Sequence, residues 1–457
     1  MTERWEADVA IVGAGFAGLT AARDLVAAGK TVVVLEARDR VGGRVLNQDL
    51  DEGEGGGKVV EMGGQWIGPT QDRVAKLAVE LGVETFPTFD QGDRLVFLGD
   101  KRYRYRGEYP TRINPAVLAD FGLAQLRFDR MAKSVDLERP WDTPRARLLD
   151  RETLESWVVR TMRTGRARTL FRTTFELIFA EEPMNISLLH ALFYFRSGVD
   201  VNTMIRITGG AQQDRFVGGS QLLAQRMADE LGDSVLLSGP VRSIDQSGPS
   251  VVVAHTDRGR AEARRAIVTV PPALASRIDY RPVLPAGRDQ LTQRMPHGSV
   301  IKVNAVYDTP FWRDHGLSGQ AFDPGLPMSS ALDNSPPDGS PGVLVGFFEG
   351  DFGREFGAAD RAERRRVALD CFARYFGPKA KGPASYFDLD WSAEPWTRGC
   401  YGAHLPPGVW TEYGPWLRRP VDRLHWAGTE TAAHWCGYMD GAVESGQRAA
   451  REVLEAL

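Results

Sequence analysis

Cysteine is scarce in this chain, which has three cysteines in 457 residues. Cys371, Cys400 and Cys436 cannot form a disulfide framework, so they fit a reducing compartment. The sequence also lacks any run approaching the roughly 18 apolar residues of a membrane span. Its first residues, MTERWEAD, contain no apolar segment of the kind that a secretory signal needs. We therefore expect a soluble, cytoplasmic protein with no membrane contact.

A strong charge of one sign is missing as well. The chain has 56 Lys and Arg against 60 Asp and Glu, a net charge of −4, which argues against a nucleic-acid partner. The seven histidines are scattered, and no cluster resembles a metal site or a Ser/His/Asp set. The content of apolar residues, 42%, is that of an ordinary globular protein, and the length indicates two or three domains.

The clearest motif that is present lies in residues 8–37, DVAIVGAGFAGLTAARDLVAAGKTVVVLEA. A short apolar run, Val9 to Val12, predicts a buried parallel strand. An amphipathic helix and a second strand, Thr31 to Leu35, follow it. The turn between the first strand and the helix has the pattern G-x-G-x-x-G, formed by Gly13, Gly15 and Gly18. Such glycines allow a tight turn, a close approach of the backbone to a pyrophosphate, and close packing of helix on strand.

Glu36 makes this motif specific. An acidic side chain about 20 residues after the glycines is placed to bind ribose hydroxyls, and it would repel a 2′-phosphate. Arg38, Gly43 and Arg44 follow, and we interpret them as further phosphate contacts, with a solvated surface turn as the alternative. The segment Gly63, Gly64, Gln65 and Trp66 predicts a strand that ends in a tight turn against a flat group.

Beyond residue 84 the pattern changes. Strands near residues 94–105 lead into a long helical region, roughly 115–197, before nucleotide-domain-like elements return at 215–272. The segment GSVIKVNAVYD predicts a strand in which Lys302 shares a face with Asn304 and Val306. Alternation alone therefore favours an exposed lysine on an edge strand. The last stretch predicts a strand, LHWAG, and a helix that begins near Tyr438 and Met439, whose N-terminal N–H groups suit an electron-rich acceptor.

Taken together, these motifs resemble the flavin-containing monoamine oxidase family, with bacterial putrescine oxidases among the close relatives. The resemblance covers nearly the full length and is carried by VGAGFAGLTAA, LEARDRVGGR, GGQW, FVGGS, GSVIK, RGCY, PVDRLHWAGTETAAHW and GYMDGAVESGQRAA. It implies an α/β fold with a discontinuous, Rossmann-like FAD-binding domain of the glutathione-reductase type (residues 1–84, 212–295 and 391–457). The remainder, 85–211 and 296–390, would be an α+β substrate domain with a mixed sheet and helices. The family habit also implies a homodimer.

The resemblance implies oxidative deamination of a primary monoamine by bound FAD and O2, giving aldehyde, ammonia and H2O2. Tyr401 and Tyr438 match two aromatics that face each other before the flavin. Lys302 matches a lysine that holds a water near flavin N5, so the resemblance implies a buried Lys302 at the site and not an exposed one on an edge strand. These three are the candidate catalytic residues. Cys400 matches a cysteine that forms a thioether to the flavin in the monoamine oxidases, whereas putrescine oxidases usually hold FAD without one. The predicted cofactor-binding residues are Gly13, Gly15, Gly18, Glu36, Arg38, Gly43, Arg44, Gly63, Gly64, Gln65, Trp66, Val241, Trp391, Cys400, Gly428, Thr429, Glu430, Tyr438 and Met439.

The predicted substrate-binding residues are Leu177, Ile178, Met204, Ile205, Gln212, Ser330 and Phe347. Ser330 departs from the family, because it falls where monoamine oxidases have a gate tyrosine and putrescine oxidases a glutamate. A polyamine oxidase would need an acid to hold a second ammonium, and the sequence places none. An amino-acid oxidase would need an arginine that binds the substrate carboxylate, and Arg206 is the candidate. A flavin dehydrogenase that passes electrons to a protein acceptor, or a catalytically idle FAD-binding module, also stays open. The mitochondrial enzymes of the family continue into a membrane helix, whereas this sequence stops at Leu457, so we expect a soluble protein. The choice between hydride transfer and a polar nucleophilic route to the flavin stays open.

Overall fold

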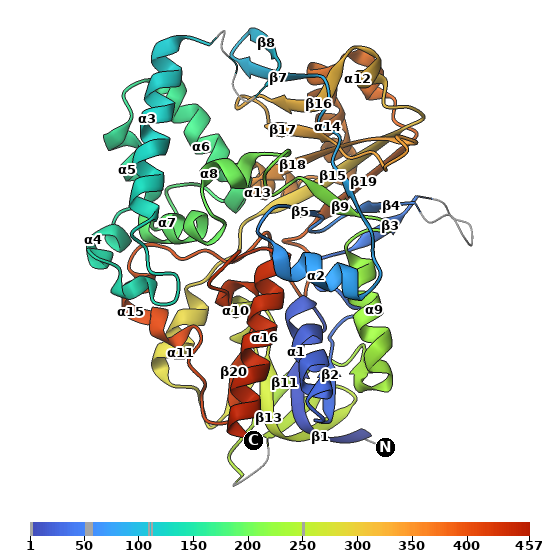
Figure 1. Ribbon diagram of the computed structural model, residues 1–457, viewed down its shortest axis with the longest axis vertical. Coiled ribbons are helices and arrows are strands. Elements are labelled where there is room, and N and C mark those ends of the chain that lie inside the picture. The colour runs from blue at the N-terminus through green and yellow to red at the C-terminus, as the bar shows by residue number, and fades with distance from the viewer. Residues whose placement is uncertain (1–2, 51–57, 108–109, 111–112, 249–251) are drawn as a thin grey trace.

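The computed structural model describes residues 3–50, 58–107, 110, 113–248 and 252–457 (Figure 1). One large sheet within them has the strand order β10-β2-β1-β13-β12-β11-β14, with β20 paired to β13. The strand β1 lies between two parallel neighbours, β2 and β13, and its apolar residues Val9 to Val12 are buried as predicted. The strands are β1 (Glu3–Val12), β2 (Val32–Leu35), β10 (Val235–Leu236), β11 (Val241–Asp245), β12 (Val252–Thr256), β13 (Gly259–Val268), β14 (Asp279–Arg281) and β20 (Leu424–Trp426).

Helices from the two ends of the chain cover this sheet together. Figure 1 shows the first helix, α1 (Phe16–Ala27), beside the last, α16 (Met439–Ala456), and their contact is close because it is lined by small residues. A Cβ atom on Gly446 would lie 2.4 Å from the backbone oxygen of Ala17. The helices α2 (Asp72–Glu80) and α9 (Gln221–Leu231) pack beside this pair.

A second sheet has the strand order β19-β15-β18-β17-β16-β7-β8. Only the pairing of β16 with β7 is parallel among the described pairs of this sheet, so it is mixed, as expected. Its strands are β7 (Asp93–Leu98), β8 (Lys101–Tyr105), β15 (Val300–Tyr307), β16 (Leu317–Phe322), β17 (Ser330–Asp333), β18 (Gly342–Glu349) and β19 (Ser385–Asp390). The helices α12 (Phe311–Asp314), α13 (Gly350–Ala358) and α14 (Arg361–Phe376) accompany it.

The edge-strand interpretation of Lys302 is wrong. The strand β15 is paired on both sides, with β18 and with β19, and all eight of its residues are buried. Lys302 lies opposite Phe347 on one neighbour and Leu389 on the other. Alternation reports which residues share a face, but it does not report what covers that face.

The predicted helical region forms a separate layer built on aromatic side chains. The ring of Phe128 contacts those of Phe171, Phe175 and Phe195. The helices of this layer are α3 (Pro115–Ala132), α4 (Ala146–Arg151), α5 (Leu154–Thr161), α6 (Gly165–Phe179), α7 (Leu188–Ser197) and α8 (Val201–Ile205); α10 (Pro272–Ala275), α11 (Ala286–Gln293) and α15 (Val409–Tyr413) complete the described α-helices.

Two small sheets connect these layers: β3 (Asn47–Asp49) pairs with β4 (Val59–Glu61), and β9 (Asp214–Phe216) lies between β5 (Trp66–Ile67) and β6 (Thr85–Pro87). The mixed α/β architecture is as expected, and the chain enters the first sheet in three separate stretches. The exact domain boundaries stay a prediction. Among the described residues, no helix combines the length and the apolar character that crossing a membrane requires.

Candidate active site

A single cavity of about 1040 Å³ connects the predicted dinucleotide turn to the predicted aromatic cage. Gly13, Gly15 and Glu36 line it on one side, and Lys302 lies with Tyr401 on the other. The predicted residues that line this cavity are Gly13, Gly15, Glu36, Arg38, Gly43, Arg44, Gly63, Gly64, Gln65, Trp66, Leu177, Ile178, Met204, Ile205, Gln212, Val241, Lys302, Ser330, Phe347, Cys400, Tyr401, Gly428, Thr429, Tyr438 and Met439. Residues from both sheets and from the helical layer therefore meet at one place.

The glycine turn has the shape that a pyrophosphate needs. Gly13 has a φ of +107°, which strains any side chain, and a Cβ atom on Gly18 would lie 2.0 Å from the oxygen of Gly13. Gly18 thus packs the helix on the strand and does not line the cavity. A Cβ atom on Gly15, in contrast, would meet only Gly42 and Gly43 at 4.0 Å, so its open side faces the cavity. These residues fit the nucleotide half of FAD.

Glu36 is buried at the end of β2, where its carboxylate accepts hydrogen bonds from two backbone N–H groups. Ala14 donates to one oxygen at 2.8 Å and Arg38 donates to the other at 2.9 Å. These bonds hold the carboxylate beside the turn at the cavity wall. Its position suits the predicted contact with ribose hydroxyls.

Both arginines after this motif already have carboxylate partners. The Arg38 guanidinium binds Glu394, and the Arg44 guanidinium binds both oxygens of Glu430. Although burial alone would raise the pKa of Glu430, Arg44 holds that pKa well below its ordinary value. Glu430 is buried in this ion pair, next to Gly428 and Thr429 in the cavity wall, and its role in cofactor binding stays a prediction. The phosphate contacts of Arg38 and Arg44 stay a prediction.

Lys302 reaches from β15 toward the turn that follows β4. Its Nζ atom donates to the backbone oxygen of Gly63 at 2.8 Å and to the side-chain oxygen of Gln65. Gln65 in turn donates to Asn334 at 2.6 Å, which fixes its amide. Burial lowers the pKa of Lys302 to about 7, although the nearby carboxylate of Glu61 opposes this shift. The lysine is therefore held rigidly and is close to losing its charge at neutral pH.

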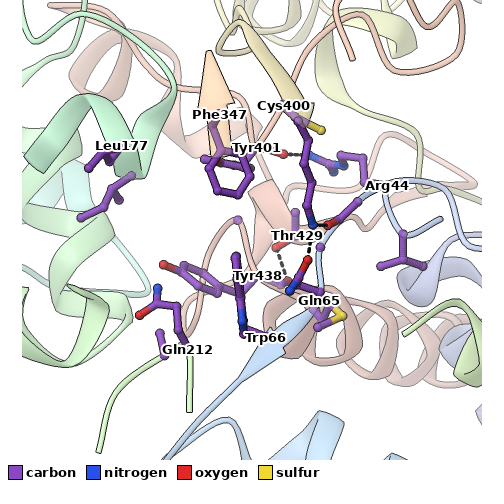
Figure 2. A pocket seen from close by; sticks show the side chains of 18 of the residues that line it. Arg44, Gln65, Trp66, Leu177, Gln212, Phe347, Cys400, Tyr401, Thr429 and Tyr438 are labelled. Atoms are coloured by element: carbon purple, nitrogen blue, oxygen red, sulfur yellow. Dashed lines mark hydrogen bonds between the residues drawn. The ribbon is translucent and has the colours of Figure 1, made fainter. Parts of the chain in front are cut away.

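Aromatic rings border the other end of the cavity. Figure 2 shows Tyr401 beside Phe347 on one wall, with Tyr438 and Trp66 across from them. The rings of Tyr401 and Phe347 meet edge to face with centroids 6.2 Å apart, and Tyr438 packs on Trp435 at 5.0 Å. Such packing fixes the plane of each phenol. The placement agrees with an amine held between two phenol rings.

Cys400 lines the cavity next to Tyr401 and is buried. Burial raises the pKa of its thiol to about 12, although Arg44 opposes this shift. Trp391 packs in the same cluster but lies behind the wall, where its indole N–H donates to the oxygen of Met62 at 2.8 Å. The contact of Trp391 with the cofactor stays a prediction.

The predicted substrate walls come from four different regions of the chain. Leu177 and Ile178 lie on α6, Met204 and Ile205 on α8, Ser330 on β17 and Phe347 on β18, and all of them line the cavity. Gln212 also lines it and is anchored by a hydrogen bond of 3.0 Å from its amide nitrogen to Met204. Arg206 lines the cavity too.

One carboxylate in this cavity was not expected. Glu349 ends β18, lines the cavity and accepts a hydrogen bond of 2.8 Å from the hydroxyl of Tyr401. A signal for it exists in the sequence, because Glu349 is two residues after Phe347 on one strand and so shares its face.

The comparisons with known proteins agree with this geometry. Residues 16–454 match the model of the flavin containing amine oxidoreductase family. The chain is 44% identical over 453 residues to AofH of Mycobacterium tuberculosis, a protein named as a flavin-containing monoamine oxidase, covering 99% of this chain and 98% of that one. It is 39% identical over 456 residues to amine oxidase [flavin-containing] B of Cavia porcellus, covering 98% and 86%.

Among solved structures, the fold is similar to that of a putrescine oxidase bound to putrescine. The TM-score is 0.94 at 36% identity, over 99% of this chain and 100% of that chain. The full-length match in sequence and in fold leads to one conclusion. The chain belongs to the family of flavin-containing amine oxidoreductases, and it is an FAD-dependent amine oxidase.

Proposed function

We propose that this enzyme deaminates primary monoamines oxidatively, with O2 as the final electron acceptor and aldehyde, ammonia and H2O2 as products. The observation that carries the proposal is the continuity of the cavity, which runs from the glycine turn to the space between Tyr401 and Tyr438. Bound FAD supplies a two-electron acceptor for the amine. The protein supplies a buried, mostly apolar pocket and fixed orientation.

Each part of the cavity has a role in this proposal. The turn around Gly15 and the carboxylate of Glu36 hold the nucleotide half of FAD, and Tyr401 and Tyr438 align the amine by their ring faces. Lys302, fixed by Gly63 and by Gln65, places its Nζ atom near the reacting end of the cofactor. Leu177, Ile178 and Phe347 form apolar walls for the side chain of the substrate, and the small Ser330 leaves room for it.

We also infer that Cys400 forms a covalent bond to FAD, because its thiol lines the cavity beside Tyr401. The three cysteines are free and buried, which supports a cytoplasmic enzyme. The homodimer follows from the resemblance alone, and light scattering of the purified protein would measure it.

The test is peroxide release by the purified holoenzyme with a panel of amines at equal concentration. We expect turnover of benzylamine, tyramine or phenethylamine to exceed that of putrescine, and stoichiometric H2O2 formation. Stronger turnover of putrescine would refute the monoamine preference. Reduction of the flavin by an amine without peroxide formation in air would instead indicate a dehydrogenase.

A further inference from the structure

Glu349 places a carboxyl group in the wall of the cavity beside Tyr401, whereas Glu36 lies in the same wall at the glycine turn. Glu349 is 8% exposed, and one oxygen of its side chain accepts the hydrogen bond from Tyr401. Among the described residues, no cation forms an ion pair with Glu349, and no donor reaches its second oxygen. A carboxylate in a buried wall normally has a cationic partner. Here the ligand is the group that can provide one.

The surroundings of Glu349 are acidic. Burial raises the pKa of Glu349 well above its ordinary value, the hydrogen bond from Tyr401 opposes this, and the neighbouring Glu176 of α6 raises it further. Burial raises the pKa of Glu176 as well, and Glu182 adds to this shift. The nearby cations are held by other acids, since Arg172 binds Glu155 while Arg354 binds Glu181 and Asp351. The groups that act on Glu349 and Glu176 are thus Tyr401, Glu182, Arg172 and Asp351.

The substrate brings a proton that must leave. An alkylamine has a pKa near that of lysine, about 10.4, and arrives at neutral pH as an ammonium ion. Its nitrogen lone pair has to be free before the amine is oxidised. Inside a cavity with low dielectric, an ammonium and a carboxylate cost more to bury than a neutral amine and a neutral acid. Transfer of the proton inside the cavity is therefore favoured by the same burial that makes Glu349 a stronger base.

We propose that Glu349 is the base that removes the proton from the substrate ammonium, an inference that rests on the proposed amine oxidation. The N–H bond breaks, the nitrogen keeps its electron pair, and the proton forms an O–H bond on the second oxygen of Glu349. No electron is transferred in this step.

The variant that tests this is Glu349→Gln. A glutamine has the same shape and its amide oxygen still accepts the hydrogen bond from Tyr401, so Tyr401 keeps its position while the base is lost. A suitable probe is tert-butylamine, which has no α-hydrogen and is not oxidised, and whose binding to the holoenzyme is followed by the flavin absorbance between about pH 6 and 10.

The wild type takes up an ammonium without net proton release when Glu349 is ionised. We therefore expect its affinity to be independent of pH between the pKa of Glu349 and that of the amine. Glu349→Gln has to bind the free base, so its affinity should rise about tenfold per pH unit over the same window. Equal pH profiles for the two proteins would overturn the proposal.

Flavin reduction under anaerobic conditions provides a second measurement. With a monoamine at neutral pH, Glu349→Gln should lower the rate constant of reduction about 100-fold, and the defect should shrink as the pH approaches the pKa of the amine. The matched control is Glu176→Gln, which keeps Glu349 and removes the acidic neighbour that raises its pKa. In a plot of the reduction rate constant against pH, the acidic limb of this variant should lie at lower pH than that of the wild type. An unmoved limb would also contradict the proposal.

Two other outcomes distinguish failure of the proposed role of Glu349 from failure of the proposed amine oxidation. If Glu349→Gln weakens putrescine alone and leaves the monoamine profile unchanged, Glu349 binds a second ammonium and is not the base. If no amine reduces the flavin of the wild type, the proposed function fails before Glu349 is tested.

Discussion

Two glycines of the same turn, Gly15 and Gly18, should affect different properties when each is replaced by alanine: Gly15→Ala should weaken FAD binding, and Gly18→Ala should lower the stability of the apoprotein. Gly15 has an extended backbone with φ of −80°, which alanine adopts easily, and its new Cβ atom would meet no atom closer than 4.0 Å. The unfolding free energy of the apoprotein should therefore change by less than about 0.5 kcal/mol. The new methyl group would occupy the space into which the pyrophosphate must fit.

Gly18 lies on the opposite side of the turn. Its new Cβ atom would lie 2.0 Å from the backbone oxygen of Gly13 and 3.1 Å from the hydroxyl of Thr269. Because the closest atom belongs to the backbone, α1 must move away from β1. Overpacking of this kind costs about 1 to 3 kcal/mol or more, so Gly18→Ala should lower the stability of the apoprotein by at least that amount.

The assay compares both variants in a Cys400→Ala background, from which FAD can be removed. Urea unfolding followed by tryptophan fluorescence gives stability, and titration of the apoprotein with FAD gives affinity. A steric cost of about 1 to 3 kcal/mol should weaken FAD binding to Gly15→Ala about 5- to 150-fold. The reasoning is refuted if Gly15→Ala binds FAD like its parent, or destabilises the apoprotein as much as Gly18→Ala does.

Three further changes test other parts of the site. Burial lowers the pKa of Lys302 to about 7, so between pH 7 and about 10 the unfolded chain binds more protons than the folded apoprotein, and the free energy of unfolding rises with pH. Lys302→Met should remove up to about 1.4 kcal/mol per pH unit of that rise. An unchanged slope of the free energy of unfolding against pH, measured by urea unfolding, would contradict the lowered pKa. Glu430→Gln leaves Arg44, whose side chain is 21% exposed, without its buried counter-charge and should lower the free energy of unfolding by about 3 kcal/mol. The control Glu3→Gln, at the exposed pair with Arg258, should lower it by at most about 1 kcal/mol. Acid precipitation should leave the flavin in the pellet for the wild type and release it for Cys400→Ala, and a yellow supernatant from the wild type would disprove the covalent bond.

The sequence predicts the dinucleotide turn well because its signal is local. Gly13, Gly15, Gly18 and Glu36 lie within thirty residues, and the apolar run before them and the amphipathic helix between them agree with their spacing. The residues that line the cavity are predicted by the resemblance to the family. Hydrophobic periodicity does not predict them, because it cannot tell a residue of the core from one that borders a cavity.

The features that local sequence patterns do not predict depend on contacts between segments that are far apart in the chain. Alternation placed Lys302 on an exposed face because it does not show that β18 and β19 flank β15 on both sides. The partner of Arg44 is Glu430, 386 positions away. Glu349 is different, because its distance of two residues from Phe347 on one strand is a local signal that places it on the same face.

The contact between α1 and α16 also affects how the protein is made. The strand β1 is synthesised long before β13, β20 and α16, the helix that packs on α1. During translation the glycine turn is therefore exposed on an incomplete sheet, and we expect cofactor loading to follow the synthesis of α16. Loss of the turns of α16 by proteolysis or early termination would uncover the face of α1 on which they pack.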